Sequence, residues 1–332
     1  MKQYGLKILL FVLFLIASIS VSAYDFQVDG IYYFKYPNNV ASVTFYNKSN
    51  NRTYKYSGDI VIPETVEYNG VTYTVEIIDI RAFYVCAINS FTFPSTIKTI
   101  GEEAFAACYS SAPISLPNVE TIGKDAFANM ENLTDVAPLE SIVTLDYGAF
   151  RNCNKLKSIQ FGNNLTEIGG SAFYDCRALT EVTIPNGTKK IGDSAFYGCY
   201  NLETVTLGSG LEMIERYAFN MCSIKTIYCY AIVPPTCVKG AGYNSNYYPF
   251  DLNGNQTTLY VPYGTKEAYS KADGWSKIKN IIEMESSGIV SSKVDVEETS
   301  IYTLNGNKII APQKGINIIK SKDGRSKKVF VR

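Results

Sequence analysis

The chain has 332 residues, and its 31 Lys and Arg residues balance 31 Asp and Glu residues, so it lacks the excess of positive charge expected of a nucleic-acid-binding protein. Histidine is absent, which removes the most common general base and the most common zinc ligand. A chain of this length exceeds a typical single hydrophobic core, so we expect several parts or a repetitive array.

Residues 1–23 have the features of a secretory signal peptide. Lys2 and Lys7 supply positive charge, the run from Leu9 to Ala17 is almost entirely apolar, and Val21-Ser22-Ala23 is a small-residue cleavage site. The apolar run is short for a membrane span, and no charged stop-transfer segment follows it. We therefore favour a secreted or outer-surface chain, with no membrane span after signal removal, over a retained anchor.

Residues 24–77 have the alternation and turn signals of β structure. Strand-like runs stand at 31–34, 42–45 and 71–75, and Asn69-Gly70 marks a hairpin turn. A stack of repeats needs a cap over its first open core, so we expect this segment to be an N-terminal β cap. The alternative is a separate ligand-binding β domain.

Residues 78–229 carry an internal repeat. An Ala-Phe pair recurs at steps of 22 or 23 residues, and a Cys follows the Phe by three residues in six of the seven copies, with Met130 in the remaining one. A fixed period of this size is typical of a solenoid. The repeated phenylalanines are Phe83, Phe105, Phe127, Phe150, Phe173, Phe196 and Phe219.

The copy around Phe173 shows what each repeat should form. Its last part, Leu179-x-x-Val182-x-Ile184, ends in the alternation of a short strand with one buried face. The three-residue spacing of Ala-Phe-x-x-Cys instead predicts about one helical turn. We expect a strand, a turn and a short helical return in each copy. Because no copy can bury its apolar face alone, the phenylalanines should stack in a ladder through a shared core.

The runs of the form Ile-Gly-x-x-Ala-Phe-x-x-Cys-x-x-Leu-x-x-Val-x-Ile-Pro resemble the leucine-rich repeats of the BspA-like bacterial surface proteins, over roughly Ile78 to Cys229. The resemblance implies an α/β solenoid of the leucine-rich repeat type. It also implies a non-catalytic binding or adhesion protein of the bacterial cell surface, with host extracellular proteins or other cells as partners.

Residues 230–285 are expected to close the array. Pro234-Pro235 interrupts the repeat, residues 259–262 predict a last strand, and residues 265–275 predict a helix. The run Val261-Pro262-x-Gly-Thr-x-x-Ala-Tyr, followed by Gly274-Trp275, resembles the C-terminal end of BspA-like arrays. We expect Trp275 to plug the last coil.

Residues 286–332 predict a serine-containing linker and a small C-terminal β module. Strand patterns at 301–304, 315–319 and 328–331 surround a hairpin signal at Asp323-Gly324. The segment resembles the β-sandwich tails that direct Bacteroidetes proteins through type IX secretion, although it is shorter than a usual tail. The residues that carry the likeness are Tyr302-x-Leu304-x-Gly306, Lys314-Gly315-Ile316 and the ending 327–332. Surface retention and a plain β module remain alternatives.

The eight cysteines of a secreted chain suggest a disulfide framework. Six of them, however, occupy one repeat position whose side chains should run parallel, and Met130 fills the same position, so we expect buried free thiols there. Cys229 and Cys237 fall outside this position and could pair. Because the chain has no His and no Cys-x-x-Cys, we expect no metal site and no cofactor.

The residues at positions 7, 8 and 10 after each Phe are expected to face outward on the strand side. They are mainly Thr, Ser and Lys, with scattered acids. A polysaccharide-active β-helix enzyme would need clustered carboxylates. Asp135 and Glu181 share a column, but two rungs, or about 9–10 Å, separate them, and no other feature supports catalysis. We therefore expect no catalytic residues.

The strand face is the best binding candidate, because solenoids use extended faces for recognition. The rivals are the polysaccharide-active enzyme and a purely structural surface component. The residues expected to contact a protein or glycan partner are Lys157, Gln160, Glu181, Thr183, Glu203, Thr206 and Tyr228.

Overall fold

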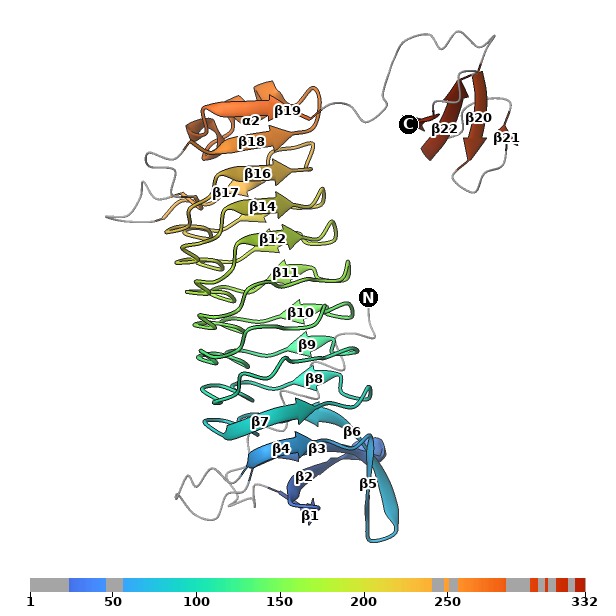
Figure 1. Cartoon of the computed structure of the whole chain (residues 1–332), viewed down its shortest axis with the longest axis vertical. Coiled ribbons are helices and arrows are strands. Elements are labelled where there is room, and N and C mark those ends of the chain that lie inside the picture. Colours follow the sequence, from blue (N-terminus) through green and yellow to red (C-terminus); the bar gives the residue numbers. More distant parts are fainter. Residues whose placement is uncertain are drawn as a thin grey trace.

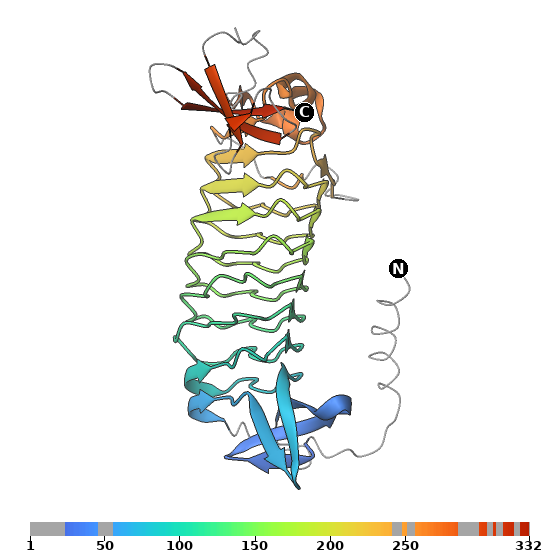
Figure 2. The same cartoon turned by 90° about the vertical axis from the view of Figure 1, so that its right-hand side faces the viewer.

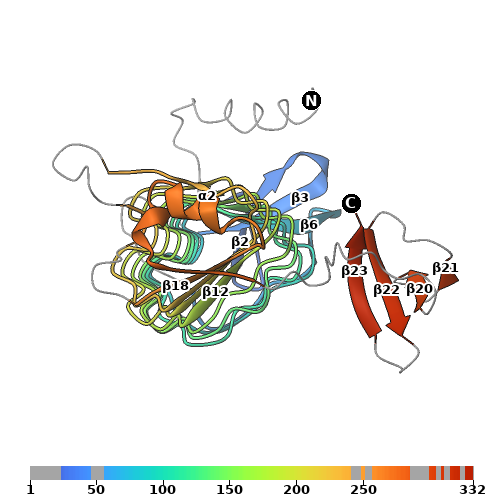
Figure 3. The same ribbon diagram turned by 90° about the horizontal axis from the view of Figure 1, so that it is seen from above.

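The structure, a computed structural model, describes residues 24–45, 56–240, 248–250 and 256–284, together with the strands of the C-terminal segment. The expected signal peptide at 1–23 lies outside the described residues. The described residues between 24 and 284 form a rod of stacked coils (Figure 1). Figure 3 looks along this rod and shows the coils overlying one another.

One sheet runs along the whole rod and is built mainly from two-residue strands, each of which pairs in parallel with its counterpart in the next coil. Only its first strands, in the N-terminal segment, pair antiparallel. Its members are β1 (Phe26–Val28), β2 (Ile31–Tyr36), β3 (Val40–Thr44), β5 (Thr65–Tyr68), β6 (Val71–Ile78), β8 (Thr99–Ile100), β9 (Thr121–Ile122), β10 (Thr144–Leu145), β11 (Glu167–Ile168), β13 (Lys190–Ile191), β15 (Met213–Ile214) and β17 (Thr236–Cys237).

A second, parallel sheet covers another side of the rod in its C-terminal half, and Figure 2 shows its first strands one above the other. In β12 the side chains of Val182 and Ile184 are buried and those of Glu181 and Thr183 are exposed, which is the expected alternation. The strands of this sheet are β12 (Glu181–Ile184), β14 (Thr204–Leu207), β16 (Thr226–Cys229), β18 (Thr258–Val261) and β19 (Asn280–Glu283).

The predicted helical return is wrong. The Ala-Phe-x-x-Cys segments are turns, in which Ser171 and Asp175, two residues either side of Phe173, have φ of 53° and 61°. A right-handed helix cannot continue through such residues. The backbone amide of Phe173 donates instead to the carbonyl oxygen of Ala195 in the next coil at 2.7 Å, and the same bond recurs along the rod.

The α/β label is therefore corrected to a strand-rich solenoid. Among the described residues the helices are α2 (Lys266–Lys271) and the 3-10 helices η1 (Pro37–Asn39) and η3 (Trp275–Lys277). The helix expected at 265–275 is shorter because Ala272 is extended, with φ −69° and ψ 137°.

The seven repeated phenylalanines lie in one column along the core. Each side chain is at most 1% exposed. The centroids of neighbouring rings are 5.0–5.5 Å apart, and the ring planes are within 11° of parallel. This stacking buries one large aromatic surface in every coil and fixes the step between coils.

The column extends beyond the repeats at both ends. The ring of Tyr56 lies 4.8 Å from that of Phe83, and just after it β4 (Ser57–Val61) pairs in parallel with β7 (Ala87–Thr92). Coil stacking thus begins within the segment that we expected to be a cap.

At the other end, Phe250 adds a ring that the sequence analysis missed. Its ring stacks 5.2 Å from Phe219, whose amide donates to the carbonyl oxygen of Pro249 where earlier copies use an Ala carbonyl. Trp275 then packs 5.3 Å from Phe250, is fully buried, and donates from Nε1 to the carbonyl oxygen of Pro235 at 2.7 Å.

The C-terminal segment forms a separate antiparallel sheet, in the order β21-β20-β22-β23. The turn expected at Asp323-Gly324 lies outside the described residues. The strands are β20 (Thr299–Thr303), β21 (Lys308–Ile309), β22 (Gly315–Ser321) and β23 (Ser326–Val331).

Candidate binding groove on the strand face

The outward face of the second sheet presents two columns of side chains, set by its in-register parallel pairing. One column is mostly hydroxyl and amide, whereas the other changes from threonine to aromatic and apolar residues toward the C-terminal end. The first contains Glu181, Thr204, Thr226, Thr258 and Asn280, and the second contains Thr183, Thr206, Tyr228, Tyr260 and Ile282.

A groove of about 500 Å³ lies at the N-terminal end of this face. It is bounded by β12 and by residues 158–163 of the preceding coil. Four of the seven predicted partner-binding residues line it: Gln160, Glu181, Thr183 and Thr206. Its other lining residues are Ser158, Ile159, Phe161, Asn163, Val182, Ile184, Pro185, Asn186, Gly208 and Tyr230.

The groove coincides with a break in the hydrogen-bonded ladder. β12 is the first strand of its sheet, and among the described residues no backbone hydrogen bond joins it to residues 157–161. The carbonyl oxygen of Thr180 accepts from the amide of Glu203 at 2.9 Å, on the β14 side. Because alternate residues of a parallel strand face opposite neighbours, the amides and carbonyls of Glu181 and Thr183 face the groove.

A large side chain lies beside the break. Phe161 stands eleven residues after Phe150, at the repeat position where the next copies have Ile184 and Leu207. Its ring lies edge-on to Phe173, with centroids 5.9 Å apart. The step from Phe150 to Phe173, at 5.5 Å, is also the widest between neighbouring repeat rings. A bulkier, half-buried residue thus stands at the strand position of this coil, where the step between repeat rings is widest.

The other three predicted residues lie outside the groove. Lys157 is exposed just before the coil segment that lines it. The carboxylate of Glu203 is paired with Lys225, with 2.5 Å between Nζ and Oε1. Tyr228 stacks on Tyr260, with ring centroids 4.9 Å apart. Lys157 and Glu203 each stand seven residues after the Phe of their copy, one residue before the strand position begins.

Sequence reasoning missed Asn163 and Asn186 as lining residues. Both stand thirteen positions after their Phe, in the turn that follows the strand position, so adjacent copies repeat the same amide at the same place. That repetition is the signal in the sequence that identifies them.

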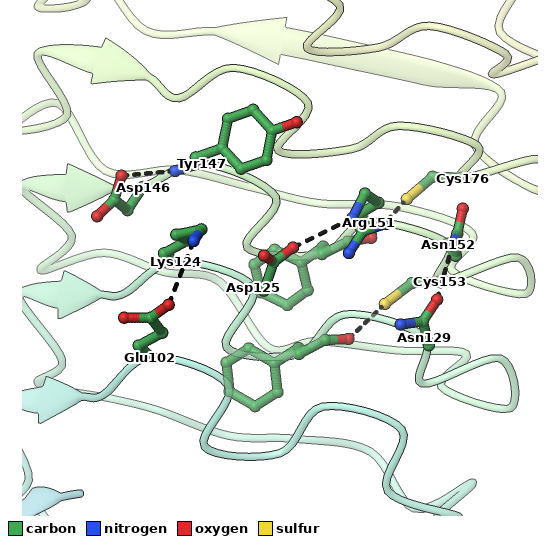
Figure 4. Close-up of polar contacts among 12 residues, drawn as sticks. Glu102, Lys124, Asp125, Asn129, Asp146, Tyr147, Arg151, Asn152, Cys153 and Cys176 are labelled. Carbon is green, nitrogen blue, oxygen red and sulfur yellow. Dashed lines mark hydrogen bonds and ion pairs between the residues drawn. The ribbon is translucent and has the colours of Figure 1, made fainter. Parts of the chain in front are cut away.

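Charged groups on the turn side of the rod pair between coils. Arg151 Nε lies 3.1 Å from Asp125 Oδ1, and Lys124 Nζ lies 3.3 Å from Glu102 Oε1 (Figure 4). These acids are engaged with cations rather than gathered into a reactive cluster. In the groove, Glu181 is the single carboxylate among the described lining residues, whereas glycoside hydrolysis needs two.

The repeated cysteines are buried, and four of them contact the preceding coil. The Sγ atoms of Cys153, Cys176, Cys199 and Cys222 lie 3.1–3.2 Å from the carbonyl oxygen of the preceding copy's Phe, and Figure 4 shows two of these contacts. Burial raises the pKa of the Cys86 thiol to about 11 and that of Cys153 to about 12. Thiols held protonated in this way are poor nucleophiles.

All eight cysteines are free, including Cys229 and Cys237. Within the part of the chain that the structure describes, no three His, Cys, Asp or Glu side chains are grouped to hold a metal ion. None of the described helices has the length and apolar character that a membrane span requires.

The model of the BspA type leucine rich repeat region matches residues 19–142, 64–177 and 120–234. The chain belongs to this family. Nothing in this BspA type match indicates an enzyme. No curated protein matches the chain.

Several solved structures resemble the chain at low identity. A leucine rich cell surface protein from Faecalibacterium prausnitzii A2-165 is 21% identical with a TM-score of 0.47, over 93% of this chain and 61% of that one. The leucine rich repeat protein TpLRR of T. pallidum is 22% identical with a TM-score of 0.42, over 61% and 81%. A leucine-rich repeat protein from Bacteroides ovatus ATCC 8483 is 20% identical with a TM-score of 0.33, over 78% and 88%. The chain thus spans 61% of the length of the first of these proteins.

Proposed function

We propose that this BspA type repeat protein is a non-catalytic binding or adhesion protein of the bacterial cell surface. It recognises a protein or glycan partner through the outward face of β12, β14, β16, β18 and β19. The observation that carries the proposal is the groove beside β12, where side-chain polar groups and unpaired backbone groups meet.

The available hydrogen-bonding groups favour recognition over a solvated structural surface. Within the described residues, the side chains of Gln160, Glu181 and Thr183 make no hydrogen bond or ion pair to the protein. The amides and carbonyls of Glu181 and Thr183 add donors and acceptors in fixed positions. The stacked coils hold these backbone groups in place, so ordering them on binding would cost little conformational entropy.

The proposal includes export to the surface. The signal-like segment at 1–23 favours secretion, and the antiparallel sheet of β20 to β23 suits a small sorting or retention module. Cell fractionation followed by mass determination of the mature chain tests this part. An N-terminus at Tyr24 on an outer-surface protein supports it, whereas an intact Met1 in the cytoplasm contradicts it.

The binding part is tested by presenting the mature chain, from Tyr24 to Arg332, to immobilised extracellular matrix proteins and to glycans. We expect saturable binding to at least one of them. A variant altered on the strand face should fail to compete with the unaltered chain for the partner, whereas a variant altered on the turn side should compete with it. If the chain binds neither matrix proteins nor glycans, the proposal is contradicted and a purely structural surface component is favoured.

A further inference from the structure

We infer that the groove beside β12 binds a neutral glycan, as one or two pyranose units of an oligosaccharide. This inference rests on the proposed function and names the ligand class of the same face. It depends on four features of the groove: its hydrogen-bonding groups, its charge, its exposed aromatic ring and its volume.

The hydrogen-bonding groups match those of a sugar. Each sugar hydroxyl both donates and accepts, so a site that offers mixed donors and acceptors suits it. The carboxamides of Gln160 and Asn163 each provide both functions, as do the hydroxyls of Thr183 and Thr206. The Oδ1 of Asn186 already accepts from the amide of Ser209 at 3.0 Å, which orients the Asn186 Nδ2 as a donor.

The charge of the groove favours a neutral ligand. No Lys or Arg is present among the described residues that line it, and Glu181 makes no ion pair there. The nearby Glu203 shows the contrast, because Lys225 neutralises it at 2.5 Å. An anionic ligand would meet the Glu181 carboxylate without a compensating cation, whereas the hydroxyls of a neutral sugar can donate to it.

Tyr230 supplies an aromatic surface at the edge of the groove. Its residue is 45% exposed, and its amide donates to the carbonyl oxygen of Leu207 at 2.9 Å, which fixes its backbone. Gly208, which also lines the groove, lets its backbone approach Pro185 closely, because a Cβ there would lie 2.3 Å from the carbonyl oxygen of Pro185. The apolar C–H face of a pyranose can stack on such a ring while the sugar hydroxyls face the amides.

The spacing of the two coils in the core disfavours the insertion of a peptide strand between them. A peptide that added a strand to β12 would have to separate two coils by two ladder spacings, about 9.6 Å. The rings of Phe150 and Phe173, which belong to these two coils, stack at 5.5 Å. The volume of about 500 Å³ instead falls in the range of small-ligand sites, about 300–1,000 Å³.

The test uses the mature chain and a panel of neutral gluco-, manno- and galacto-configured oligosaccharides, with sialylated and sulfated oligosaccharides and a random peptide library as the other arms. Affinities are measured by titration calorimetry and by saturation-transfer NMR. We expect at least one neutral oligosaccharide to bind, and the anionic ones to bind at least about tenfold more weakly.

Tyr230→Ala and Asn186→Ala should each weaken that binding by about tenfold or more. The matched controls are Tyr109→Ala and Asn132→Ala, which change the same residue types on exposed positions outside the groove. They should change the affinity by less than about twofold. Unchanged thermal unfolding in all four variants shows that the fold is retained.

The outcomes separate this inference from the proposed function. Neutral glycan binding that the two groove variants lose supports both. Binding of peptides or anionic glycans alone, or glycan binding that the groove variants retain, overturns the glycan assignment and leaves a binding function. Binding of no member of any arm overturns both.

Discussion

Replacing Phe173 by Ala should strongly destabilise the rod. The Phe173 ring is fully buried between those of Phe150 and Phe196, at 5.5 and 5.1 Å, and Phe161 lies edge-on at 5.9 Å. Removing a buried Phe side chain typically costs ~3–5 kcal/mol, and more when the neighbours cannot collapse into the space. Here the neighbouring rings are tied to their own coils by backbone hydrogen bonds, so we expect the upper part of this range.

Urea titration of the mature chain, followed by circular dichroism, measures the loss. Tyr109→Ala is the control, because Tyr109 is 67% exposed and its replacement should cost less than ~0.5 kcal/mol. Phe173→Leu should lose less than Phe173→Ala, since it keeps most of the apolar volume and removes only the stacking. A loss below ~1 kcal/mol for Phe173→Ala, at an unchanged slope with urea concentration, would refute the aromatic column as a source of stability.

Three further predictions follow from the buried thiols and the strand face. A thiol reagent at about pH 8 should leave all eight cysteines of the folded chain unmodified and should modify all eight after unfolding; rapid reaction in the folded state would contradict their burial. Burial raises the pKa of Cys153 to about 12 from its ordinary 9.0, so the stability that its protonated thiol contributes is complete below about pH 9 and is lost as the pH rises to about 12. Cys153→Ala should therefore make the alkaline fall in the free energy of unfolding shallower. An identical fall in both proteins would contradict the pKa shift. Reversing the charges of Lys157, Glu181 and Glu203 together should weaken partner binding and leave the fold intact, since the Glu203–Lys225 pair that it breaks is exposed. Reversing an equal set of charges on the turn side should not weaken binding, and equal binding by both variants would place the site elsewhere.

The sequence predicted the parts of the fold that depend on periodicity. The steps of 22 or 23 residues gave the stacked coils, and the alternation in Leu179-x-x-Val182-x-Ile184 gave the strand and its outward face. The return segment was mistaken for a helix because three-residue spacing fits both a helical turn and a series of tight turns. What distinguishes them is the positive φ at Ser171 and Asp175, and residue types alone do not fix it.

Phe250 and the groove show where periodicity stops being informative. Phe250 follows Phe219 by 31 residues, and Pro249 replaces the usual Ala, so neither the spacing nor the motif marks it. The groove lies beside Phe161, at a position where other copies have smaller residues. That substitution is visible in the sequence, but the sequence does not show how the two coils are spaced around it.

Hydrogen exchange of backbone amides in the mature chain tests most directly whether the coils are joined along the aromatic column and open beside β12. We predict strong protection of the Phe127 and Phe173 amides, each of which donates to an Ala carbonyl of the next coil at 2.7–2.8 Å. The amides of Glu181 and Thr183 should exchange much faster, because no described backbone acceptor faces them. Equal protection at all four positions would mean that the ladder is closed and the groove absent, and fast exchange at the two phenylalanines would mean that the coils do not stack.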